Sequence, residues 1–298
     1  MKVVIAGATG LVGSELTNQL IQEGHQVKKL VRREARTPNE IAWNPEQQRL
    51  SVADLEGTDV VINLAGENIS EGRWTAAKKK SIIESRLLST STLTNAVLTM
   101  QHPPSTFINA SAVGFYGNRS DELLTEKSAN GEGFLAHVCK EWEKAAEPLT
   151  HKKVRLVYSR FGVILSPHGG ALKKMLTPFK LGLGGVIGSG KQFMSWIALE
   201  DVVGSLIHLM LDKSIHGPVN IVSSQPVTNA DPTKTCGNVL TRPTIFSVPT
   251  SVARFVFGEM ADELLLSSLR VSNQKLLESG YSFKQPNLEQ YLRNALNT

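Results

Sequence analysis

The chain has 298 residues, of which 41% are hydrophobic and 20% charged, as expected for a soluble globular protein long enough to bury a sizeable core. Its 32 basic and 27 acidic residues give a formal charge of +5 without a basic tract, which argues against a nucleic-acid partner. Two cysteines without metal-ligand spacing, no apolar leader and no membrane-length apolar stretch predict a cytoplasmic protein with no metal, no disulfide framework and no membrane partner.

Apolar, β-branched runs alternate with helical patterns through the first 165 residues. Helical spacing of leucines and isoleucines appears at 11–24, 75–100 and 134–149, and strand-like runs occupy 2–7, 25–32, 59–66, 105–117 (strand, then loop) and 153–165. Strand and helix in this order build right-handed βαβ units. The sequence therefore predicts an α/β fold, a Rossmann-type doubly wound parallel sheet with helices on both faces.

The regular alternation ends after residue 165. Residues 180–193 are too rich in glycine for long regular structure, while 198–211 predicts a helix and 217–224 one more strand. Short helical patterns and prolines follow to the C-terminus. We therefore predict a Rossmann domain over 1–165, with segments around 192–224 returning to it, and a smaller C-terminal α/β substrate domain built from 166–191 and 225–298.

A glycine-rich turn, "GATGLVG", joins the first strand to the first helix. Gly7 allows a tight turn, Gly10 lets a pyrophosphate approach the backbone, and Gly13 lets the helix pack against the strand. The N–H groups and the positive dipole end of the helix face the anion. The turn predicts a dinucleotide site that also includes Thr9, Leu11 and Val12; a purely structural turn is the alternative.

The second strand ends in "LVRRE", and this ending bears on the choice of cofactor. NAD enzymes carry an acidic residue there for the ribose 2′-hydroxyl, whereas NADP enzymes need cations for the 2′-phosphate. Arg32 and Arg33 supply guanidinium groups that match phosphate geometry, and Glu34 is the less suited ribose ligand. The sequence favours NADP(H); a solvated basic pair is the alternative.

Further motifs carry a resemblance to a known family. "DVVINLAGE", "INASAVGFYG", "SRFGVIL", "FKLGLGGVIGSGKQFMSWI" and a late "GE" pair follow the glycine turn. With them the whole chain resembles the extended short-chain dehydrogenases/reductases, and more narrowly an atypical family within them named for sugar-nucleotide epimerases, which has a small C-terminal domain. The resemblance implies that Leu64, Ala65 and Gly66 line the cofactor and that Ser111 is the catalytic serine.

One expected feature of that superfamily is missing. Its members use a tyrosine as general acid/base with a lysine four residues later, on a helix some two dozen residues beyond the serine. That stretch, "GFLAHVCKEWEKAA", has no tyrosine, and none of the chain's four tyrosines precedes a lysine at this spacing. Tyr116 is the proposed proton carrier, with His137 and Lys140 as further candidates. Cys139 is expected to be a buried, small apolar residue.

Several charged and polar residues are candidates for the cleft. Arg86, where relatives carry an asparagine, would face the cofactor phosphate or an anionic substrate, and an exposed helix charge is the alternative. Glu67 and Arg73 would bind substrate or pair with each other. The glycine-rich segment is a candidate lid over the substrate, with Lys191, Gln192 and Trp196 as ligands, or else a plain connecting loop. Asp201 is expected to cap or position the next helix.

Together these features predict an NADP(H)-dependent epimerase or oxidoreductase that acts on a small molecule, with a nucleotide sugar as the candidate substrate. The alternative is a non-catalytic NADP(H)-binding protein with a regulatory or redox-sensing role, which the missing Tyr–Lys pair favours. A homodimer is expected only because helix-pair dimers are common in the superfamily.

Overall fold

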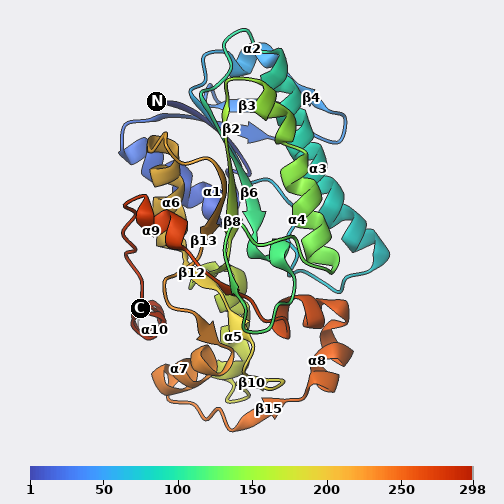
Figure 1. Ribbon diagram of the computed structural model, residues 1–298, viewed down its shortest axis with the longest axis vertical. Coiled ribbons are helices and arrows are strands. Elements are labelled where there is room, and N and C mark those ends of the chain that lie inside the picture. The colour runs from blue at the N-terminus through green and yellow to red at the C-terminus, as the bar shows by residue number, and fades with distance from the viewer. Residues whose placement is uncertain (297–298) are drawn as a thin grey trace.

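An eight-stranded sheet, parallel except at one edge, forms the centre of the larger part of the molecule (Figure 1). The computed structural model describes residues 1–296. In spatial order the strands are β13 (Gly217–Ile221), β8 (Arg155–Phe161), β6 (Thr106–Ala112), β5 (Val60–Asn63), β1 (Lys2–Ala6), β2 (Gln26–Val31), β3 (Glu40–Asn44) and β4 (Arg49–Leu50). Only β4 runs antiparallel, to β3. Because the chain turns back at β1, with β2 on one side and β5 on the other, the predicted Rossmann-type fold is confirmed.

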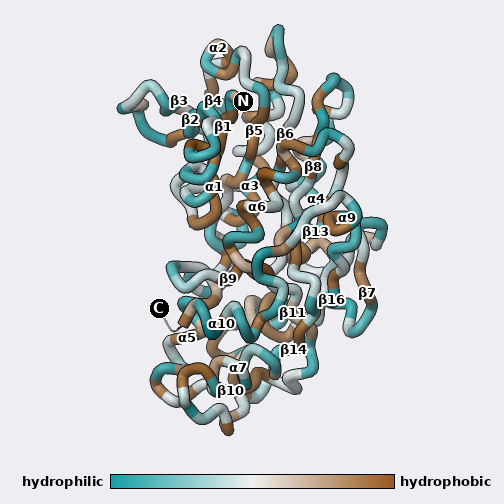
Figure 2. The backbone as a smooth tube through the Cα atoms, turned by 90° about the vertical axis from the view of Figure 1, so that its left-hand side faces the viewer, coloured by the Kyte–Doolittle hydropathy of each residue, from teal (hydrophilic) through white to brown (hydrophobic). Residues whose placement is uncertain are grey.

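Alternate residues of the central strands feed two hydrophobic cores. In β1, Val3 and Ile5 enter one core, while Val4 enters the other. Helices α1 (Leu11–Gln22), α6 (Leu199–Leu211) and α9 (Gln274–Glu278) cover the first face; α3 (Ala76–Thr99), α4 (Phe134–Lys144) and a 3₁₀ helix at Glu147–His151 cover the second, with α2 (Val52–Leu55) at its end. Figure 2 shows hydrophobic stretches along β1, β5 and β6. Both faces of the sheet are therefore buried, as a parallel sheet requires.

Helix α3 packs on the sheet through small hydroxyl side chains as well as apolar ones. Thr90 Oγ1 accepts hydrogen bonds from Asn63 Nδ2 at 2.9 Å and from Trp142 Nε1 at 3.0 Å, and Asn63 Nδ2 also donates to Asn109 at 2.8 Å. The sequence predicts an ordinary amphipathic helix here. In the structure, a satisfied polar network ties the ends of β5 and β6 to α3 and α4.

The smaller part of the molecule, called the C-terminal part below, is built from short elements. Its strands pair two by two: β9 (Val163–Ser166) with β12 (Trp196–Ala198), β10 (Gly185–Ile187) with β15 (Phe246–Val248), and β11 (Phe193–Met194) with β14 (Val227–Thr228). Its helices are α5 (Gly170–Lys180), α7 (Ala230–Leu240), α8 (Thr250–Phe257) and α10 (Leu288–Leu296), with one wide helical turn at Ala261–Leu265. A further pair, β7 (Leu123–Leu124) with β16 (Arg270–Val271), joins it to the loop after β6.

The chain returns to the large sheet near its end. Leu276 of α9 is buried in the core beneath α6, although sequence analysis assigns this segment to the C-terminal domain. Asp201 is fully buried at the start of α6 and accepts hydrogen bonds from Tyr281 Oη and from the backbone N–H groups of Lys284 and Gln285. Asp201 therefore anchors the segment that leads to α10. Among residues 1–296, no helix combines the length and apolarity of a membrane span.

Candidate cofactor and substrate site

The glycine turn leaves no room for side chains at two of its positions. Gly7 has φ +76°, and a Cβ there would lie 2.7 Å from the carbonyl carbon of Leu64, just after β5. A Cβ on Gly13 would lie 2.2 Å from the carbonyl oxygen of Gly7. Because both contacts are with backbone, neither neighbour can move aside. The turn is thus pressed against the end of β5 while α1 is pressed against the turn.

The middle glycine of the turn, Gly10, borders open space at the N-terminus of α1. A Cβ on Gly10 would touch only the Gly7 carbonyl oxygen, at 3.4 Å, and no side chain caps the helix. The first-turn N–H groups thus have no side-chain acceptor, and Thr9 and Gly10 are exposed while Leu11 and Val12 are half-buried. This cradle fits the pyrophosphate of a dinucleotide, with the dipole of the helix favouring its charge.

The two arginines after β2 differ in their surroundings. Arg33 forms a two-pronged ion pair with Glu40 of β3, with Nη2 2.6 Å from Oε1 and Nη1 2.9 Å from Oε2. The hydrogen bond from Arg33, together with one from the Arg36 backbone N–H, lowers the pKa of Glu40 to about 2. The exposed side chain of Arg32 has no partner within residues 1–296. Arg32 is therefore the guanidinium available for a 2′-phosphate.

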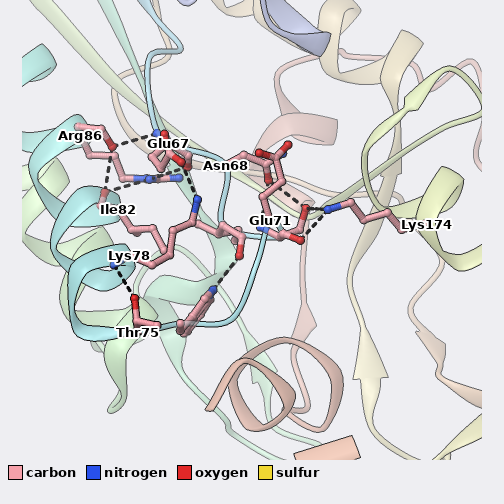
Figure 3. A network of polar contacts seen from close by, with 12 residues as sticks. Glu67, Asn68, Glu71, Thr75, Lys78, Ile82, Arg86 and Lys174 are labelled. Carbon is pink, nitrogen blue, oxygen red and sulfur yellow. Dashed lines mark hydrogen bonds and ion pairs between the residues drawn. The ribbon is translucent and has the colours of Figure 1, made fainter. Parts of the chain in front are cut away.

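Residues 64–66 run from the end of β5, past the glycine turn, toward Arg86. A Cβ on Gly66 would lie 3.2 Å from Arg86 Cζ, so the guanidinium packs directly on this glycine. Arg86 Nη1 donates to the carbonyl oxygens of Glu67 at 3.1 Å and Ile82 at 3.0 Å (Figure 3). Its Cζ lies 4.9 Å from the centre of the Trp142 ring. Burial lowers the pKa of Arg86.

The loop after residue 66 is held by ion pairs and hydrogen bonds. Glu67 pairs with Lys78 of α3 at 2.5 Å and not with Arg73, which answers the question that the sequence left open (Figure 3). Arg73 is exposed and lies against Gly258, where a Cβ would come within 3.3 Å of Nη2. Lys174 of α5 donates to the carbonyl oxygen of Ser70 at 2.6 Å and so connects this loop to the C-terminal part.

Ser111 and Tyr116 lie in a buried network instead of facing the cleft. Ser111 Oγ donates to Glu143 Oε1 at 2.7 Å, and Arg160 donates to the same carboxylate through Nε and Nη2, each at 2.8 Å. Arg160 Nη1 also donates to Tyr116 Oη at 2.9 Å, and that hydroxyl donates to Asn220 at 2.6 Å.

Burial raises the pKa of Tyr116, whose side chain is 0% exposed. Both hydroxyl protons are already engaged, so this arrangement differs from the predicted roles of substrate contact and proton carrier. The alternation of side chains along β6 explains the position of Ser111. Phe107, Asn109 and Ser111 lie on the face that is covered by α3 and α4, whereas Ile108 and Ala110 face α1 and α6.

Helix α4 offers no replacement for the missing tyrosine at this point. Leu135 packs against Gly114, and Cys139 lies beside it in the core, where burial raises the pKa of the thiol to about 12. His137 and Lys140 are exposed on the opposite face of the helix. The expected buried role of Cys139 agrees with the structure, whereas His137 and Lys140 face away from Ser111.

A cavity of ≈ 400 Å³ lies between the loop after β6, the start of α4 and the C-terminal part. Glu132, Asp262, Glu263 and Arg254 are its charged lining residues. Arg254 pairs with Asp262 at 2.9 Å. Glu263 accepts hydrogen bonds from the backbone N–H groups of Phe134 at 2.9 Å and Leu135 at 3.1 Å, so its carboxylate caps α4 from the C-terminal part. The lining is therefore more acidic than basic.

The three residues expected to bind substrate from the glycine-rich segment have different positions. Gln192 lines the cavity, but its Nε2 already donates to the carbonyl oxygens of Ile187 and Leu265. Lys191 is exposed. Trp196 is 0% exposed, its Nε1 donates to Gln225 and it lies in the core of the C-terminal part, so its predicted contact with substrate is not possible in this arrangement. Within the described residues, no cluster of side chains could hold a metal ion.

Sequence reasoning missed four residues that shape the site: Glu40, Lys78, Glu143 and Glu263. Glu143 and Glu263 act on groups far away in the chain, whereas Glu40 and Lys78 act on groups seven and eleven residues away, and no motif marks any of the four. For Glu143 a signal did exist, because Ser111 and Asn109 share the parity of the buried Phe107 and so had to meet polar partners under α3 and α4.

Comparisons with known proteins agree with this architecture. The profile of the NAD dependent epimerase/dehydratase family matches residues 3–222, and a domain of unknown function, DUF1731, matches residues 248–295. Epimerase family protein Mb2239 of Mycobacterium bovis is 43% identical over 281 residues, which cover 94% of this chain and 93% of the relative. The human epimerase family protein SDR39U1 is 36% identical over 291 residues, 97% of either chain.

Solved structures include two with substantial sequence identity. The crystal structure of human SDR39U1 with NADPH superposes with a TM-score of 0.92 at 34% identity and covers 100% of both chains. A nucleoside-diphosphate sugar epimerase from Corynebacterium glutamicum gives a TM-score of 0.82 at 37% identity, over 99% of this chain but 58% of that one. UDP-glucose 4-epimerase of Thermotoga maritima, at 16% identity and a TM-score of 0.76, shares the fold.

Proposed function

The chain belongs to the NAD dependent epimerase/dehydratase family, and from this premise we propose that it binds NADP(H) and carries out a redox or epimerase reaction on a small molecule. The observation that carries the proposal is the glycine cradle at α1 with the unpartnered Arg32 one strand away. The human relative, 34% identical over the whole chain, was crystallised with NADPH, which supports the same cofactor here.

The positions of the cradle and of Arg32 indicate which part of the cofactor each would bind. The N–H groups at the start of α1 would hold the pyrophosphate, and Arg32 would hold the 2′-phosphate of the adenosine half. When bound, the cofactor supplies or accepts a hydride. The nicotinamide half would then lie over the ends of β5 and β6, beside the loop that borders the cavity.

The cavity would receive the substrate. It lies between the Rossmann and C-terminal parts, which is where families of this architecture place ligands. A nucleotide sugar is the candidate, because one relative is named as a nucleoside-diphosphate sugar epimerase. Ser111 and Tyr116 would act as positioning residues: through Glu143 and Arg160 they fix the loop that contributes Gly114 and Gly117 to the cavity wall.

A second candidate function is a non-catalytic NADP(H)-binding protein. It is favoured by one observation, that the buried hydroxyls of Ser111 and Tyr116 are both engaged and that Leu135 and Cys139 occupy the inner face of α4. Under this alternative the protein would respond to the redox state of the cofactor without turnover.

The purified full chain distinguishes these functions. Titration with NADPH and NADH by isothermal calorimetry should show tighter binding of NADPH. Nucleotide sugars and extracts of small metabolites are then added to the complex with reduced or oxidised cofactor, and the absorbance of the reduced nicotinamide is followed, with chromatography of the sugars to detect epimers formed without net redox change. Equal affinity for NADH would overturn the cofactor assignment. Tight NADPH binding without any product would favour the non-catalytic protein.

A further inference from the structure

Arg86 is a guanidinium beside Gly66 with unused hydrogen-bond donors. Of its nitrogens, Nη1 donates to two carbonyl oxygens, those of Glu67 and Ile82, while Nε and Nη2 make no hydrogen bond within residues 1–296. The carboxylate of Glu67, whose carbonyl oxygen Arg86 contacts, is paired with Lys78 instead (Figure 3), and that of Glu84 lies 3.7 Å from Lys80. Arg86 thus has a fixed orientation, unused donors and no salt bridge in the described part of the chain.

The surroundings of Arg86 hold it in this place. It packs on Gly66, where any side chain would come within 3.2 Å of Cζ, and it lies 4.9 Å from the Trp142 ring. Stacking on an aromatic ring stabilises a guanidinium, but it satisfies none of the N–H donors. Burial lowers the pKa of Arg86 and thereby indicates that the group has lost part of its hydration. Acceptor oxygen atoms on a ligand would compensate for this loss.

The order of the strands tells which part of the cofactor would lie there. The pyrophosphate cradle follows β1, and Arg32 follows β2 on one side of it. A dinucleotide carries its two nucleosides on opposite sides of the pyrophosphate, so the nicotinamide nucleoside must extend to the other side, over the ends of β5 and β6. Gly66 and Arg86 lie on that side, because residues 64–66 follow β5.

We propose that Arg86 binds the ribose hydroxyls of the nicotinamide half of NADP(H) and so positions the nicotinamide over the ends of β5 and β6. This inference rests on the proposed function. The two unused nitrogens of the planar guanidinium match two neighbouring hydroxyl oxygens, a geometry that a lysine could not reproduce. Arg86 is thus a specificity residue for the nicotinamide nucleoside, whereas Arg32 recognises the adenosine 2′-phosphate.

A fragment of the cofactor separates these two roles. Adenosine 2′,5′-bisphosphate carries the 2′-phosphate but no nicotinamide ribose. The full-length variants Arg86→Gln and Arg32→Gln are titrated with NADPH and with this fragment by calorimetry. Arg86→Gln is expected to weaken NADPH binding about tenfold or more and to leave fragment binding within about twofold, because a hydrogen bond to a charged donor contributes about 1.5 to 3 kcal/mol. Arg32→Gln should weaken both.

Two further variants serve as controls. Lys80→Gln removes a charge from an exposed side chain on the same helix and should leave both affinities unchanged. Arg86→Lys keeps the charge but loses the planar arrangement of donors, and it should also weaken NADPH binding. It replaces Arg86→Gln as the test if that variant does not fold, and thermal unfolding shows whether each variant is folded. The inference is overturned if Arg86 variants bind NADPH as the wild type does, or lose NADPH and the fragment equally. If the wild type binds neither ligand, the proposed function itself fails.

Discussion

Arg32 and Arg33 are neighbours in sequence, but only one of them is free to bind a phosphate. Glu40 holds Arg33 through two hydrogen bonds, whereas the Arg32 side chain has no partner within residues 1–296. A 2′-phosphate could reach only the remaining N–H groups of Arg33, and its negative charge would repel the Glu40 carboxylate beside them. Arg32 should therefore dominate the preference for NADPH.

The first prediction compares the two arginines. Arg32→Gln should raise the Kd for NADPH by about tenfold to 100-fold and leave the weaker binding of NADH nearly unchanged, because only NADPH carries the 2′-phosphate. Arg33→Gln should have a clearly smaller effect. Calorimetric titration of each variant with both cofactors gives the four constants. Equal losses for the two variants would show that Glu40 releases Arg33 on binding.

The second prediction concerns the pH dependence of the Arg33–Glu40 pair. The folded-state pKa of Glu40 is about 2, below the roughly 4.3 of an unfolded chain, so the pair stabilises the fold above pH 4.3 and this contribution is lost as the pH falls toward 2. Glu40→Gln should lower the melting temperature at neutral pH, and the difference from the wild type should shrink between about pH 5 and pH 2. Scanning calorimetry along this pH series measures it; a constant difference would contradict the assignment.

At the scale of single elements, the alternation of side chains along a strand decides which face of the sheet a motif residue lies on. The serine of "INASAVGFYG" faces α3 and α4 because Ser111 and Phe107 lie an even number of residues apart on β6. The Glu143–Arg160 pair beneath it is buried, with the Glu143 side chain 11% and the Arg160 side chain 4% exposed. This pair therefore supports β6, β8 and the following loop, and Ser111 adds one hydrogen bond to it.

The third prediction follows from that burial. Arg160→Met should lower the free energy of unfolding by about 3–5 kcal/mol, because it leaves the Glu143 carboxylate buried without its cation. Ser111→Ala should cost only about 1 kcal/mol and leave NADPH affinity unchanged. Urea unfolding gives both values. The double variant Glu143→Gln with Arg160→Met tests the explanation, since it should recover part of the stability lost in Arg160→Met alone; an equally unstable double variant would argue against it.

The parts of the structure that could be predicted are those in which the sequence acts locally. The glycine spacing of the β1–α1 turn is a local pattern of seven residues, although Gly7 also meets the backbone of Leu64, and the alternation of strands and helices predicts a Rossmann-type sheet. The hydroxyl of Ser111 and the ring of Trp196 could not be placed, because each depends on a partner from a distant element. The guanidinium of Arg33 could not be placed either, because no motif links it to Glu40 on the next strand. Successive side chains of a strand point to opposite faces of the sheet, so a shift of one residue in the strand register moves every side chain to the other face.

At the scale of the whole molecule, the proposed cofactor site and the proposed substrate site differ in how they are built. The cradle and Arg32 belong to the Rossmann part alone, while the cavity has walls from both parts. The polar contacts that cross between them, such as Lys79–Glu259 at 2.8 Å and Lys174 to Ser70, involve neither the cradle nor Arg32. Cofactor binding should therefore stabilise the Rossmann part whether or not the C-terminal part is closed.

The fourth prediction follows for thermal unfolding. At a free concentration of 100 times its Kd, NADPH should raise the free energy of unfolding by about 2.7 kcal/mol through mass action. NADH at the same concentration should raise it less, and Arg32→Gln should abolish the difference between the two cofactors. Melting curves at several cofactor concentrations measure this. A shift that is identical for NADPH and NADH would contradict the role of Arg32.

The carboxylate of Glu263, which caps α4 from across the cavity, has a dynamic consequence. The amide protons of Phe134 and Leu135 are bonded to a group in the C-terminal part, and not to their own helix. Whenever the two parts separate, these protons are released to solvent together. Their rate of exchange with deuterium should therefore report how often this cavity opens, and it can be measured before any substrate is identified.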